Sequence, residues 1–208
     1  MHCDRRTGFV ARLRGALLTL GAGALAAGLS GAAVAQERRV PETYTAVTQN
    51  MTPAGVELRA DVLNWSTDEE RAAAIEAMAA EDPRAALTAL PTAGVVWRTG
   101  SPVGHAIKYA HRREIPDGGE VVTLVTDRPI GSSSFTPWVA EPPAETALAY
   151  SVVELAVPAA GSGEGTMAIA AEVRIDAAAA TVALDRSGRT AVLGDVVKQP
   201  KPYWATGD

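Results

Sequence analysis

Two histidines, His105 and His111, are the residues of this sequence best suited to bind a metal ion or to transfer protons. They stand six residues apart in a segment, 105–114, that has the pattern of a β-strand. At about 3.3 Å per residue the two imidazoles would be roughly 20 Å apart, which is too far to share one ion. A metal site made of one histidine and carboxylates from other strands is the alternative, but packed or surface histidines are the simpler interpretation. We therefore predict no metal site and no cofactor.

Three consecutive serines, Ser132, Ser133 and Ser134, offer a second route to chemistry. Ser134 can be combined with His111 and Asp127 into a Ser-His-Asp triad. However, the serines lack the Gly-x-Ser-x-Gly pattern that holds a nucleophile at a strand-to-helix turn. A loop of small polar residues explains them better, so we assign no catalytic residue.

Two further patterns are typical of phosphate-binding or catalytic sites, but the elements around them do not fit such sites. The glycine-rich run 161–165 precedes a predicted strand, so no helix N-terminus is available for a phosphate, and a hairpin turn is the better interpretation. Acidic residues are numerous enough for the carboxylate pair that glycosidases use, but nearly all of them lie on a predicted helix surface, where solvation explains them. They are Asp68, Glu69, Glu70, Glu76, Glu81 and Asp82.

The irregular segment 128–143 is the strongest candidate for a binding role. It places aromatic side chains between prolines, which keeps apolar area available for a ligand at low entropic cost. Its first residue, Arg128, stands before Pro129 and is predicted to lock the strand end through an ion pair. The alternative is that Trp138 fills the core. We assign ligand or partner contacts to Arg128, Phe135, Trp138, Tyr109 and His111.

The chain that positions these residues has 208 residues, of which 47% are hydrophobic and 21% charged, with a net charge of −5. These values are typical of a globular domain. Residues 1–35 have the pattern of an export signal: arginines stand before the uncharged stretch 15–34, and Ala33-Val34-Ala35 matches a small-x-small cleavage site. An uncleaved membrane anchor is the alternative. Cleavage after Ala35 predicts a periplasmic or secreted protein with one domain, 36–208.

Removal of the signal would take away Cys3, Asp4 and four arginines (Arg5, Arg6, Arg12 and Arg14), which changes the net charge from −5 to −8. The mature chain would then contain no cysteine and would fold in an oxidising compartment without disulfides. Its negative charge favours solubility and repels nucleic acid and anionic lipid headgroups. We therefore expect no nucleic acid and no stable membrane insertion, and we expect a small apolar ligand or an envelope protein as the partner.

Strand patterns dominate the mature chain. Segment 56–62 alternates apolar and charged residues, which places Val56, Leu58, Ala60 and Val62 on one buried face, and segment 43–48 is its predicted partner. Further strands are predicted at 95–98, 105–114, 120–127, 148–157, 166–175, 181–185 and 190–198. The last six are expected to form three hairpins: 105–114 with 120–127, 148–157 with 166–175, and 181–185 with 190–198.

Two helices interrupt these strands. Ser66 and Glu69 match a capping box for a helix to about Ala80, and Asp82-Pro83 begins a second helix to about Leu90. Their narrow stripe of small apolar residues predicts helices that lie on a sheet. The stripe consists of Ala72, Ile75, Met78, Ala79, Ala86, Leu87 and Leu90. The predicted fold class is α+β: a mainly antiparallel, strongly curved or barrel-like sheet of about nine strands, with a two-helix insertion after the second strand.

Six short motifs follow one another along the mature chain, and together they resemble a family of uncharacterised exported bacterial proteins. They are Trp-Ser-Thr-Asp-Glu-Glu-Arg at 65–71, Tyr-Ala at 109–110, Pro-Asp-Gly-Gly at 116–119, Thr-Asp-Arg-Pro-Ile-Gly at 126–131, Val-Glu-Leu at 153–155 and Gly-Glu-Gly-Thr-Met at 163–167. The motifs are structural, so the resemblance implies export but carries no activity to transfer to this chain. After Gly131 this chain has Ser-Ser-Ser-Phe, where similar proteins more often carry an aromatic and acidic stretch.

Two function classes are therefore expected, and the interior of the sheet distinguishes them. The first is a non-catalytic binding or interaction module of the cell envelope, which the lack of a recognisable nucleophile favours. The alternative is an exported hydrolase with a site assembled from His105 or His111 and carboxylates. An apolar cavity of about 300 Å³ or more would favour a small ligand, a cleft containing a histidine and buried carboxylates would favour the hydrolase, and a filled interior would favour an interaction protein.

Overall fold

The computed structural model describes residues 41–130, 139–140, 148–170, 173–185 and 189–200. All of these residues belong to one compact unit, Gln36–Asp208.

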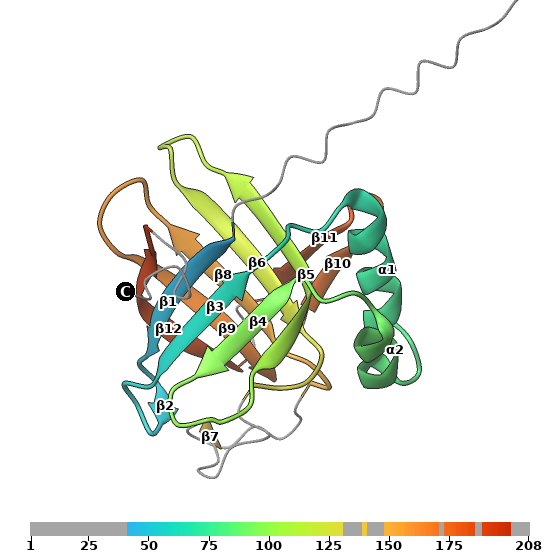
Figure 1. Ribbon diagram of the computed structural model, residues 1–208, viewed down its shortest axis with the longest axis horizontal. Coiled ribbons are helices and arrows are strands. Elements are labelled where there is room, and N and C mark those ends of the chain that lie inside the picture. The colour runs from blue at the N-terminus through green and yellow to red at the C-terminus, as the bar shows by residue number, and fades with distance from the viewer. Residues whose placement is uncertain (1–40, 131–138, 141–147, 171–172, 186–188, 201–208) are drawn as a thin grey trace, which may run out of the picture. The chain divides into compact units, whose positions relative to one another are not determined.

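Eight antiparallel strands close into a barrel (Figure 1). Around the barrel they are β1 (Glu42–Thr48), β12 (Arg189–Lys198), β9 (Gly163–Ala170), β8 (Val152–Val157), β6 (Glu120–Thr126), β5 (His105–Glu114), β4 (Gly94–Arg98) and β3 (Glu57–Val62). Two small sheets are separate from the barrel: β10 (Val173–Asp176) with β11 (Thr181–Leu184), and β2 (Met51–Thr52) with β7 (Val139–Ala140). With helices α1 (Asp68–Met78) and α2 (Pro83–Ala89), this confirms the predicted α+β fold with a barrel-like antiparallel sheet.

Every second side chain along the strands points into the barrel lumen, and together these side chains fill it. Leu58, Ala60 and Val62 of β3 are buried together, as the pattern of 56–62 predicts, and β1 pairs with β3 as expected. The same apolar cluster receives side chains from every other barrel strand, among them Leu124 of β6 and Leu193 of β12. The lumen is therefore one continuous apolar core.

A β-bulge in β5 changes which residues of that strand face outward. Ile107 pairs with Thr126 and Tyr109 pairs with Val125, so Lys108 is an extra residue with no partner in β6. Ile107 and Ala110 both belong to the lumen core, whereas Tyr109 belongs to a second cluster. Strict alternation from Ile107 would place Tyr109 inside the barrel, and the bulge is the reason why it lies outside.

The second cluster lies between the barrel wall and the elements that cover it. Tyr109, Val125 and Val152 of the wall pack with side chains of α1, α2 and β11, including Ile75 and Leu87. The helices therefore lie on the outside of the sheet, as predicted, and the barrel wall on this side has an apolar core on each face.

Both helices start at caps, although the first cap is one residue later than predicted. Thr67 is the N-cap of α1 and shares a capping box with Glu70, because the Ser66 hydroxyl is buried and accepts a hydrogen bond from the Ala110 amide at 3.0 Å. Asp82 caps α2 as predicted. Ala72 and Ala79, both predicted on the buried stripe, are exposed, whereas Ala74 and Ala77 are buried.

The C-terminal strand pairing differs from the prediction. The expected strand 166–175 is divided between β9 in the barrel and β10 outside it, and β10 pairs with β11. β12 pairs with β9 and β1, so the predicted pairing of 181–185 with 190–198 is wrong. The reason is packing: Val182 and Leu184 of β11 are buried against the outside of the barrel wall, which alternation within one strand does not reveal.

Candidate functional site

The barrel lumen is filled by its own side chains. Its central cavity measures about 10 Å³ and is lined by apolar residues such as Ala60, Val96, Leu124 and Leu193. A space of this size holds about one water molecule. It is far smaller than the roughly 300 Å³ that small-molecule pockets occupy.

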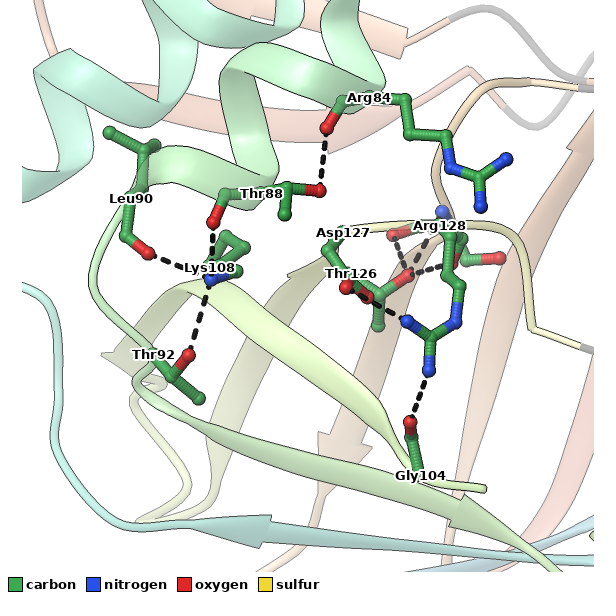
Figure 2. Close-up of polar contacts among 10 residues, drawn as sticks. Arg84, Thr88, Leu90, Thr92, Gly104, Lys108, Thr126, Asp127 and Arg128 are labelled. Atoms are coloured by element: carbon green, nitrogen blue, oxygen red, sulfur yellow. Dashed lines mark hydrogen bonds and ion pairs between the residues drawn. The ribbon is translucent and has the colours of Figure 1, made fainter. Parts of the chain in front are cut away.

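One end of β5 and β6 carries a buried polar group that we call the His105 cluster: His105, Asp127 and Arg128. His105 and Asp127 are 1% and 7% exposed. The Arg128 guanidinium donates to Asp127 Oδ2 at 3.1 Å and to the Gly104 carbonyl at 2.6 Å (Figure 2). The predicted ion pair of Arg128 is thereby confirmed, and the hydrogen bond from Arg128 to Gly104 joins the end of β6 to the loop before β5.

Burial keeps the His105 imidazole neutral. Desolvation is the main cause that lowers the pKa of His105, and Arg128 acts in the same direction, while Asp127 opposes it. His105 Nδ1 and Asp127 Oδ1 have no hydrogen-bond partner in the described part of the chain. The cluster therefore combines a neutral imidazole with a carboxylate that is already paired to an arginine.

This lowered pKa gives a testable pH dependence. As the pH falls below about 6.5, the unfolded chain binds a proton at this histidine before the folded chain does, so the free energy of unfolding falls. We expect the fall between pH 7 and pH 5 to be smaller in His105→Gln, by at most about 1.4 kcal/mol per pH unit. Denaturant unfolding at each pH measures it, and parallel profiles for the two proteins would contradict the buried neutral imidazole.

The combination of Ser134, His111 and Asp127, considered and set aside above, has no close contact between His111 and Asp127. Ser134 lies outside the described residues. His111 pairs with Thr123, four residues and about 13 Å along β6 from Asp127. The charged neighbours that act on His111 are Arg71, Arg113 and Asp68. It is His105, not His111, that the fold brings to a buried carboxylate.

The other end of β5 and β6 carries a denser network that we call the Tyr44 cluster: Glu42, Tyr44, Arg112, Glu120 and Lys198. The Tyr44 hydroxyl lies 2.6 Å from Glu42 Oε2 and 2.9 Å from Glu120 Oε1. Lys198 Nζ bonds to the same two oxygens at 2.8 Å and 3.0 Å. Arg112 Nη1 binds Glu42 at 2.9 Å. Four strands are therefore tied together across the end of the lumen.

Aromatic rings complete the Tyr44 cluster. Trp65 meets Tyr44 edge to face with ring centroids 6.4 Å apart, and the Arg112 guanidinium lies 5.0 Å from the Trp65 ring centroid. Burial alone would raise the pKa of Glu42, but hydrogen bonds from Lys198 and Tyr44, together with the charges of Lys198 and Arg112, outweigh burial and lower it. Glu42 is thus charged and paired, which is a structural arrangement and not that of a proton donor.

Replacing Lys198 by methionine should test this pairing. We expect a loss of about 1 kcal/mol at pH 7, since the ammonium is partly exposed and solvent weakens its ion pairs. Because the lowered pKa of Glu42 stabilises the fold only above the unfolded value, the loss should shrink as the pH falls below about 4.5. Arg113→Met, at an exposed position of β5, is the matched control. A loss of unfolding free energy that is equal at pH 7 and below about pH 4.5 would contradict the pairing.

Lys108, the extra residue of the β5 bulge, fixes the helices to the barrel wall. Its ammonium donates to the carbonyls of Thr88 and Leu90, at 3.2 Å and 2.7 Å, and to Thr92 Oγ1 at 3.2 Å (Figure 2). These carbonyls belong to the C-terminal end of α2, where a positive charge is favourable. Alternation from Ile107 would point Lys108 outward, but the pattern within one strand gives no signal that the end of α2 lies there to receive its ammonium.

The five residues predicted to contact a ligand have different environments. Arg128 is held by Asp127 and Gly104. Tyr109 is fully buried, and its hydroxyl donates to the Ala180 carbonyl at 3.2 Å, so it supports the β10–β11 turn. His111 is partly exposed beside the Tyr109 ring. Phe135 and Trp138 lie outside the described residues.

Within the described ranges, no group of three or more histidine, cysteine or acidic side chains is placed to hold a metal ion. In that same part of the chain, no helix is long and apolar enough to cross a membrane. No protein-family model, curated protein or solved structure matches this chain.

Proposed function

We propose that this protein is an exported, non-catalytic interaction module of the cell envelope that binds a protein partner with its outer surface. The observation that carries the proposal is the filled lumen, whose cavity of about 10 Å³ leaves no space for a small apolar ligand. Of the two partners expected from the sequence, the envelope protein is therefore the one that the barrel favours.

The polar networks support the same proposal. In the Tyr44 cluster the carboxylates are bound by Lys198 and Arg112, and Lys108 is bound by two carbonyls at the end of α2 and by the Thr92 hydroxyl. Groups that act in catalysis usually have their reactive atoms accessible to a substrate. Here the charges hold strands and helices together. Export is supported by the signal pattern of residues 1–35.

A hydrolase is the second candidate, and one observation favours it. His105 Nδ1 lacks a hydrogen-bond partner among the described residues, and Asp127 is an electrostatic neighbour of the same imidazole, so the two group types of a histidine-carboxylate general base are near each other. Hydrolysis of a panel of ester and amide substrates by the wild-type protein, abolished in His105→Ala, would establish this candidate over the first.

Native mass spectrometry of the chain recovered from the periplasm of an expression host tests the proposed function. Spectra recorded before and after unfolding should show a polypeptide that begins at Gln36, alone or in complex with a second polypeptide. An apolar small molecule that leaves on unfolding would contradict the proposal. Recovery of the chain only in the cytoplasm would contradict the export that it assumes.

A further inference from the structure

The β10 strand presents an open edge, in contrast to the closed barrel. β10 pairs with β11 on one side, and no other described strand pairs with it. Arg174, Ile175 and Asp176 are all exposed, and Ile175 is one of few large apolar side chains that are exposed in the described part of the chain. An exposed edge of this kind offers its free backbone N–H and C=O groups to another strand.

The two faces of β10 differ in character. Ile175 is paired with Val182, which is buried in the outer core, so both side chains point toward the barrel side of the hairpin. Arg174 and Asp176 point to the opposite, solvent side. On that side Arg174 Nη2 bonds to Asp185 at 2.7 Å, and Asp176 Oδ1 accepts from the amides of Ala178 and Ala179.

The sequence Arg-Ile-Asp at 174–176 is complementary to itself when two copies run antiparallel. With Ile175 of one copy opposite Ile175 of the other, Arg174 of each copy stands opposite Asp176 of the other. Opposite charges at facing positions stabilise an antiparallel pair, and the two isoleucines cover each other on the other face. Asp176 keeps its second carboxylate oxygen, Oδ2, for this contact.

We propose that two copies of this chain associate through β10, forming a four-stranded antiparallel sheet in the order β11–β10–β10–β11. The edge is only four residues long. A dissociation constant of roughly tens of micromolar is therefore expected, well above that of a large obligate dimer. This association is independent of the partner binding proposed above.

Sedimentation equilibrium from low micromolar to several hundred micromolar measures the dimer. Ile175→Lys should leave the protein monomeric over this range, because it places two like charges at the centre of the edge. Val192→Lys is the matched control: Val192 is exposed to nearly the same extent but lies on β12 in the barrel. A monomeric wild-type protein, or a dimer that Ile175→Lys does not weaken, would overturn the proposal.

Charge exchange tests the register. Arg174→Asp and Asp176→Arg should each weaken the dimer by about tenfold, since each places like charges opposite one another twice. The double variant, Arg174→Asp with Asp176→Arg, is again self-complementary and should recover the dimer, although it also lacks the turn bonds of Asp176. An equimolar mixture of the two single variants should form a heterodimer. Failure of both the double variant and the mixture to associate would overturn the register.

Discussion

Replacing Leu124 by alanine should lower the free energy of unfolding by about 3 to 4 kcal/mol. Leu124 is fully buried on β6 and lines the small central cavity of the lumen. Its removal deletes apolar contacts and leaves a larger void that the surrounding closed barrel cannot collapse to fill, which is the costly case for a large-to-small substitution. Chemical denaturation at pH 7 measures the loss.

Val192→Ala is the control for this substitution. Val192 is 38% exposed on β12, so its truncation should change the free energy of unfolding by no more than about 0.5 kcal/mol. A loss below about 1 kcal/mol for Leu124→Ala would mean that the lumen is loosely packed, contrary to the description above.

Replacing Lys108 by methionine should lower the free energy of unfolding by about 3 kcal/mol. The substitution leaves the carbonyls of Thr88 and Leu90 and the Thr92 hydroxyl without their shared donor, in a site where Lys108 is only 7% exposed. It also removes a positive charge from the C-terminal end of α2. Amide hydrogen exchange should become faster in α2 than in the barrel strands.

Arg84→Met is the matched control for Lys108→Met, because Arg84 is an exposed basic residue of α2 itself. The free energy of unfolding of Arg84→Met should lie within about 0.5 kcal/mol of the wild-type value. If the two variants were equally stable, Lys108 would not be the group that fixes the helices to the barrel wall.

Local patterns in the sequence predicted the fold class because most strands here obey simple alternation. Segment 56–62 reads apolar and charged in turn, and Leu58, Ala60 and Val62 do lie in the lumen, whereas Val56 precedes β3 and is only partly buried. Proline and glycine at 116–119 mark the β5–β6 turn, and Asp82-Pro83 marks the start of α2. Each of these signals depends only on neighbours in the sequence.

Tertiary contacts overrode the pattern elsewhere. Ser66 is as good a cap as Thr67 in sequence terms, but the amide of Ala110 takes its hydroxyl, so the cap moves by one residue. The bulge at Lys108 and the division of 166–175 into β9 and β10 likewise depend on what packs outside the barrel. The periodicity within one strand does not show which elements pack against that strand from outside the barrel.

The candidate site was also predictable only in part from the sequence. Arg128 was predicted to form an ion pair from its place at the strand end, and it does so with the adjacent Asp127. The Tyr44 cluster could not be predicted, because it joins residues as distant as Glu42, Glu120 and Lys198. Only closure of the barrel between β1 and β12 brings these three residues together.

Thermal unfolding in benzene-saturated buffer tests most directly whether the folded lumen is filled. Benzene is a smaller guest than any apolar ligand expected of a binding barrel, and a guest that binds only the folded state raises the melting temperature. We expect no rise for the wild-type protein and a clear rise for Leu124→Ala, in which the lost side chain leaves an apolar cavity. A rise in the wild-type protein would contradict the filled lumen, and with it the proposal that the barrel acts through its outer surface.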